Sequence, residues 1–142
     1  KGHFDWGTLD VPDSDMGDYK VASWAAGELS RKQDKPFFLA CGIYKPHLPW
    51  HVPSKYFDMH PLKNVQLPKV NERDLDDIPP MGRKIAKPDA DHAVVLKYHQ
   101  WERAVQSYLS AITFASWIKE ARGAESKWEK TEKTGQVALG EG

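Results

Sequence analysis

The sequence predicts an α/β fold, in which helices cover a sheet, and three observations support this class. Residues 18–32 carry apolar side chains at the three- and four-residue steps of an amphipathic helix. A nearly continuous apolar run follows at 37–43, which is typical of a strand buried on both faces of a parallel sheet. A longer helical pattern occupies residues 89–121. Helix, buried strand and helix in this order indicate a layered architecture, and 142 residues are the length of one ordinary domain.

Composition narrows the range of partners. The chain carries 20 basic and 20 acidic residues and neither charge forms a long block, so we expect no nucleic acid as partner. No apolar run approaches the roughly 18 residues that a membrane-spanning helix needs. The start of the sequence shows neither methionine nor a signal-peptide pattern, so the localisation stays open.

The first elements are an irregular entry segment at 1–17 and the helix at 18–32. Aspartates between residues 5 and 18 raise the question of a calcium site, but the spacing of an EF-hand loop is missing. Turn and cap roles are the commoner use of such aspartates, and Asp18 is the expected N-cap of the helix. Pro36 prevents the helix from continuing.

The loop after the predicted strand at 37–43 is the first candidate for chemistry. Ligands of parallel sheets collect beyond the carboxyl ends of the strands, where Tyr44-Lys45-Pro46-His47 emerges. Lys45 and His47 are two residues apart, so in extended backbone both side chains point to one side. A cation beside a titratable imidazole suits an anionic group. An exposed lysine beside a histidine that bonds a loop carbonyl fits the same spacing.

The sequence patterns for a metal site or a catalytic nucleophile are weaker than the pattern of this loop. His47, His51 and His60 suggest zinc, but Pro49 disrupts helical spacing between the first two, and a tetrahedral site needs three or four converging ligands. The spacing therefore predicts no metal ligands. The single cysteine, Cys41, lies in the apolar run, and no serine elbow, phosphate loop or Cys-x-x-Cys motif is present.

The remaining chain is predicted to hold a connection, a helix and a tail. Residues 50–80 form a long proline-rich connection, and loops of this length are commonly functional. The helix at 89–121, capped by Asp89 or Asp91, is expected to pack one stripe on the sheet. That stripe consists of Val94, Tyr98, Trp101, Val105, Tyr108, Leu109 and Ile112. Residues 123–142 are polar and are predicted to be a disordered tail.

Several of these segments resemble a known family. They are the run at 34–50 with its Lys45-Pro46-His47-Leu48-Pro49-Trp50 end, then 52–62, Leu67-Pro68 and 74–79, with 5–7 and 18–25 upstream and 103–115 downstream. Together they are similar to the middle of type I sulfatases, in the iduronate-2-sulfatase-like and bacterial branch. The resemblance implies that residues 1–122 are an internal fragment of a sulfatase catalytic domain with an alkaline-phosphatase-like sandwich. In such a fragment the proline-rich connection is expected to be the loop on the substrate side.

The resemblance implies functional roles for His47 and Lys45. In such sulfatases the histidine at the position of His47 reaches the sulfate group and assists departure of the alcohol, as a general acid can. Lys45 is expected to support substrate binding. The implied reaction is hydrolysis of sulfate esters in small molecules or glycans, and the parent enzymes are periplasmic or secreted.

The chain also departs from that family. Its members use calcium and a formylglycine made within a Cys/Ser-x-Pro/Ala-x-Arg motif, which Cys41-Gly42-Ile43-Tyr44-Lys45 does not fit. The calcium-binding aspartate pairs are missing as well, so we expect no cofactor within this chain and no turnover by it alone. Two alternatives stay open: a non-catalytic module that binds an anionic glycan or a protein, and a phosphoester hydrolase of the same superfamily.

Overall fold

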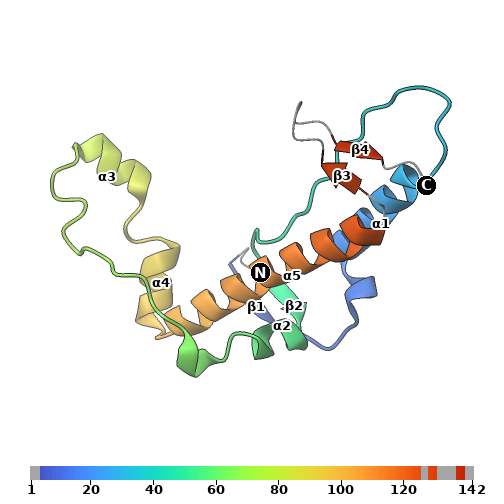
Figure 1. The fold of residues 1–142 in the computed structure, drawn as a ribbon. Helices are drawn as coiled ribbons and strands as arrows, with labels where there is room; N and C mark the ends of the chain where they lie inside the picture. The colour runs from blue at the N-terminus through green and yellow to red at the C-terminus, as the bar shows by residue number, and fades with distance from the viewer. Residues whose placement is uncertain (1–3, 126–127, 131–136, 140–142) are drawn as a thin grey trace.

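A computed structural model describes residues 4–125, 128–130 and 137–139 (Figure 1). Helices and strands are mixed, as the α/β class requires. In chain order the elements are β1 (Trp6–Leu9), η1 (Asp13–Asp15), α1 (Gly17–Leu29), β2 (Trp50–Pro53), α2 (Ser54–Asp58), η2 (Leu62–Asn64), α3 (Pro80–Ala86), α4 (Asp91–Lys97), α5 (Trp101–Glu125), β3 (Trp128–Lys130) and β4 (Val137–Leu139).

The sheet that organises the fold is a parallel pair of short strands. β1 pairs with β2 in a register that sets Trp6 opposite Trp50 and Leu9 opposite Pro53. The connection between them contains α1, as parallel strands require a crossover. The prediction of an irregular segment at 1–17 is wrong for β1, and the predicted connection at 50–80 begins with a strand. Four residues are too few for a period to be recognised.

The buried strand predicted at 37–43 is not formed. These residues have no regular structure in the link between α1 and β2, and Phe38 is 91% exposed and Phe37 46%. A buried parallel strand needs a hydrogen-bonding neighbour and helices over both faces. Within the described part of the chain, β1 and β2 pair with each other and β3 pairs with β4, so the apolar run has no partner strand. In Figure 1 the link arcs away from the helices.

The core lies where α1, α5 and β2 meet. It consists of Ala22, Val52, Tyr56, Ala111, Phe114 and Ile118. α1 lies along the second half of α5, and the buried positions of both helices are mostly alanines and serines, which let two helix backbones approach closely (Figure 1). The hydroxyls of Ser107 and Ser110 donate to the carbonyls of Arg103 and Gln106, so their burial leaves no polar group unpaired.

The long helical pattern differs from its prediction in two ways. It breaks between α4 and α5, where His99 takes a left-handed backbone with φ of 54°. The buried face of α5 carries Ala104, Ala111, Phe114 and Ile118. In the predicted stripe, Val94, Tyr98 and Tyr108 are exposed, and the other four side chains are only partly buried. Neither predicted aspartate caps α4, because its N-cap is Ala90 and no side chain caps the helix.

The remaining parts of the chain lie outside this core. Residues 66–90, which include α3, extend away from α5 (Figure 1). In the described part of the chain, no helix is both long and apolar enough to span a bilayer. The predicted tail at 123–142 lies mainly outside the described residues; 123–125 end α5, and β3 and β4 pair antiparallel. The boundary at residue 122 stays a prediction.

Candidate functional site

The predicted site residues lie in a tight turn between residues 44 and 50. The N–H of His47 donates to the carbonyl of Tyr44 at 3.0 Å, so the backbone reverses here and is not extended. The Lys45–Pro46 and Leu48–Pro49 peptide bonds are both cis. The side chains of Lys45 and His47 are both engaged within the turn. Each one bonds a different carbonyl of the turn.

The imidazole of His47 is exposed, and one of its nitrogens is engaged. Nδ1 lies 2.7 Å from the carbonyl oxygen of Leu48. A carbonyl only accepts hydrogen bonds, so Nδ1 carries a proton, and Nε2 is the nitrogen that a ligand can reach. The hydroxyl of Tyr44 donates to the same carbonyl at 2.8 Å, and its ring lies 4.8 Å from the imidazole between centroids.

Lys45 turns back into the loop. Its half-buried ammonium donates to the carbonyl of Pro49 and lies 5.8 Å from the centroid of the Tyr44 ring. Burial lowers the pKa of Lys45 from 10.5, and the carboxylate of Asp18 opposes that shift. In this arrangement Lys45 stabilises the turn, and its contact with a substrate stays a prediction.

Asp18 is the site residue that sequence reasoning missed. It is not the N-cap of α1, since that position is Met16. Its side chain, in a residue only 9% exposed, accepts the N–H of Tyr44 at 2.8 Å and the N–H of Lys45 at 2.9 Å. One signal was available: Asp18 shares a helical face with Ala22 and Ala25, and a carboxylate on a buried face needs hydrogen-bond donors.

The other end of the turn is held by aromatic residues. The indole N–H of Trp50 donates to the carbonyl of Pro46 at 2.7 Å. The ring of Trp50 lies 5.3 Å from that of Tyr108 in α5 and 6.3 Å from that of Trp6 in β1, between centroids. The turn is thereby fixed to α5 and to the sheet.

The other histidines of the zinc hypothesis have separate partners. Nε2 of His51 lies 3.4 Å from a carboxylate oxygen of Asp5, and Nε2 of His60 lies 2.7 Å from the hydroxyl of Thr113. Among the described residues, no three His, Cys, Asp or Glu side chains gather as metal ligands would. The side chains in the described part of the chain therefore do not fit a calcium site. Cys41 is exposed and lies outside the formylglycine motif, so it does not fit that group either.

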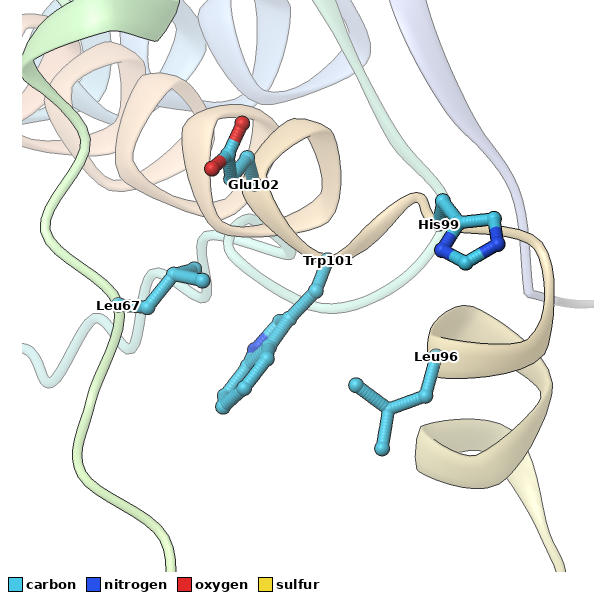
Figure 2. A pocket seen from close by; sticks show the side chains of 5 residues that line it. All are labelled: Leu67, Leu96, His99, Trp101 and Glu102. Atoms are coloured by element: carbon cyan, nitrogen blue, oxygen red, sulfur yellow. The ribbon is translucent and has the colours of Figure 1, made fainter.

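A second feature is an open hollow of about 300 Å³ at the junction of α4 and α5. Figure 2 shows the indole of Trp101 between Leu67 and Leu96, with His99 and Glu102 at the edges. None of these residues belongs to the turn at 44–50.

Comparison with known proteins identifies relatives. A protein named sulfatase from Formosa agariphila is 35% identical over 117 residues, which are 80% of this chain and 23% of the relative. Human iduronate 2-sulfatase is 35% identical over 76 residues, 52% of this chain and 14% of the relative. Mouse iduronate 2-sulfatase is 35% identical over 60 residues, 41% of this chain and 11% of the relative.

Two further comparisons gave no match. No family model matches the chain, and no solved structure matches it significantly. The chain spans less than a quarter of the length of the curated relatives named above. Within that span, the similarity includes most of this chain. The chain is therefore a sulfatase-family sequence, and it corresponds to one segment of these longer relatives.

Proposed function

We propose that this chain supplies the His47 side of the substrate site of a sulfate ester hydrolase. The observation that carries the proposal is the imidazole geometry: Nδ1 is engaged with the carbonyl of Leu48, and the exposed ring presents Nε2 to a ligand. The names of the relatives support the class of reaction, since all three are named as sulfatases.

The geometry suits two steps of that chemistry. When His47 is protonated, its Nε2–H donates a charge-assisted hydrogen bond to a sulfate oxygen. Hydrolysis breaks the bond between sulfur and the ester oxygen, and the departing alcohol needs a proton, which the same Nε2–H can deliver. The carbonyl of Leu48 keeps the ring oriented while the charge changes.

Lys45 has a secondary role in this proposal. An ammonium forms a stronger hydrogen bond with an anion than with a neutral carbonyl. A sulfated substrate beside the turn therefore competes with Pro49 for the ammonium of Lys45, which adds a second positive contact. Such a site takes sulfated small molecules or glycans.

We further propose that this chain alone binds such compounds without hydrolysing them. The formylglycine motif is missing from the sequence, and the described residues hold no cluster of metal ligands. One histidine and one lysine do not replace a nucleophile and a metal. The alternative of a binding module without a catalytic parent predicts the same binding, whereas a phosphoester hydrolase predicts a preference for phosphate esters.

Calorimetry with an aryl sulfate and the matching aryl phosphate tests these proposals on the full chain. We expect the sulfate to bind, and His47→Gln to abolish the heat of binding. His51→Gln is the matched control, because His51 lies in β2 and contacts Asp5 instead of the turn. Equal binding by His47→Gln and wild type would overturn the role of His47, and tighter binding of the phosphate would favour the phosphoester alternative. Hydrolysis of the aryl sulfate by pure chain would contradict the proposed inactivity.

A further inference from the structure

We propose that Asp18 is a positioning residue for His47: its buried carboxylate holds the backbone of the turn and thereby sets the direction of the imidazole. The inference deepens the proposed function and rests on it for its catalytic meaning. The structural link from α1 to the imidazole can be measured independently of any binding or catalysis.

Asp18 binds the backbone of the turn directly. Its two carboxylate oxygens each accept one backbone N–H, from Tyr44 at 2.8 Å and from Lys45 at 2.9 Å. Hydrogen bonds to an ionised acceptor are about twice as strong as neutral ones. Because Asp18 lies in the first turn of α1, which packs on α5, these bonds tie the turn to the core across more than 20 residues of sequence.

Tyr44 in turn contacts both the backbone and the imidazole of His47. The carbonyl of Tyr44 accepts the backbone N–H of His47 at 3.0 Å, and the two rings lie 4.8 Å apart between centroids. The Tyr44 hydroxyl and Nδ1 of His47 share the carbonyl of Leu48 at 2.8 and 2.7 Å. The backbone, the ring face and the Nδ1 acceptor of His47 therefore all depend on the placement of Tyr44, which Asp18 holds.

The turn requires a carboxylate at position 18. An aspartate presents two acceptors, which match the two adjacent N–H donors of the turn. An asparagine keeps one acceptor and turns the other position into a donor, which faces an N–H and repels it. One partly buried N–H of the turn then loses its partner, and the turn is released from α1.

The test compares Asp18→Asn with Asp13→Asn in the full chain. Asp13 is a matched control, since its carboxylate bonds the ammonium of Lys55 at 2.6 Å and the hydroxyl of Tyr56 at 2.9 Å and contacts no residue of the turn. Nitrogen-15 NMR of the histidine side chains reports which ring nitrogen carries the proton. We expect Nδ1–H in wild type and in Asp13→Asn, and a mixture of tautomers in Asp18→Asn, with affinity for inorganic sulfate reduced by about tenfold.

An unchanged His47 tautomer and an unchanged affinity in folded Asp18→Asn would overturn the proposal. If that variant does not fold, amide hydrogen exchange on wild type decides, because the N–H groups of Tyr44 and Lys45 must be protected; rapid exchange of both would also overturn it. Failure of the proposed function appears differently. In that case wild type shows no response to sulfate, while the tautomer still depends on Asp18.

Discussion

Replacement of Phe114 by alanine tests where the core of this chain lies. Phe114 is fully buried in α5, and its ring meets that of Tyr56 edge to face at 5.3 Å between centroids. Truncation of a buried phenylalanine to alanine costs about 3–5 kcal/mol, because apolar burial is lost and a cavity remains. Domains of this size are stable by about 5–15 kcal/mol, so we expect a large loss of unfolding free energy in Phe114→Ala.

Urea unfolding followed by circular dichroism measures this loss, with Phe38→Ala as the matched control. Phe38 is 91% exposed in the link between α1 and β2, so its truncation should change the unfolding free energy by less than about 0.5 kcal/mol. Similar m-values in both variants would show that the comparison is valid. A large loss in Phe38→Ala together with a small one in Phe114→Ala would refute the reasoning, because it would place the run at 37–43 in the core.

Two further predictions concern the same core. Burial raises the pKa of Tyr56 far above its ordinary 10.0, and the hydrogen bond and charge of Asp13 add to the shift. Above pH 10 the native state thus keeps a proton that the unfolded chain loses, so the contribution of Tyr56 to the free energy of unfolding is complete below about pH 10 and falls at higher pH. Urea unfolding from pH 8 to 11 should show this fall in wild type and a smaller fall in Tyr56→Phe. Equal falls in the two proteins would contradict the assignment of the pH dependence to Tyr56. Ala111→Leu should overpack the contact between α1 and α5 and cost about 1–3 kcal/mol, whereas Ser116→Leu on the exposed face should not; equal unfolding midpoints would show that Ala111 is not in that contact.

Local patterns predicted the helices better than the sheet. The apolar spacing within 18–32 predicted α1, whose bounds are Gly17–Leu29, since a helix forms its hydrogen bonds within the segment itself. The run at 37–43 looked like a buried strand, yet a strand depends on a partner elsewhere in the chain. Hydrophobicity alone does not say whether that partner exists, and the strands that do pair here are too short to be recognised.

The face of α5 was mispredicted because large side chains dominate a hydrophobic pattern. Trp101 and Tyr108 suggested the buried stripe, whereas Ala104 and Ala111 lie in the core. Small residues are buried where helices approach closely, but alanine is too common in helices of every kind to mark a face.

A loop at His47 was predicted, but neither its place relative to the sheet nor its geometry was: the turn precedes β2, whereas it was expected to follow a buried strand. The position of His47 in a loop followed from the end of the apolar run and its flanking prolines. The direction of Lys45 and the role of Asp18 did not, because both depend on hydrogen bonds that form only once the turn has closed on α1. Such contacts leave no periodic signal in the sequence.

The central claim is that His47 presents Nε2 to a sulfate group. Titration of the full chain with sodium sulfate, followed by nitrogen-15 NMR of the histidine side chains, tests it most directly, with sodium chloride at equal ionic strength as control. We predict a saturable shift of Nε2 of His47, with Nδ1 still protonated and His51 unaffected. No saturable shift at His47, or equal shifts with chloride, would contradict the claim.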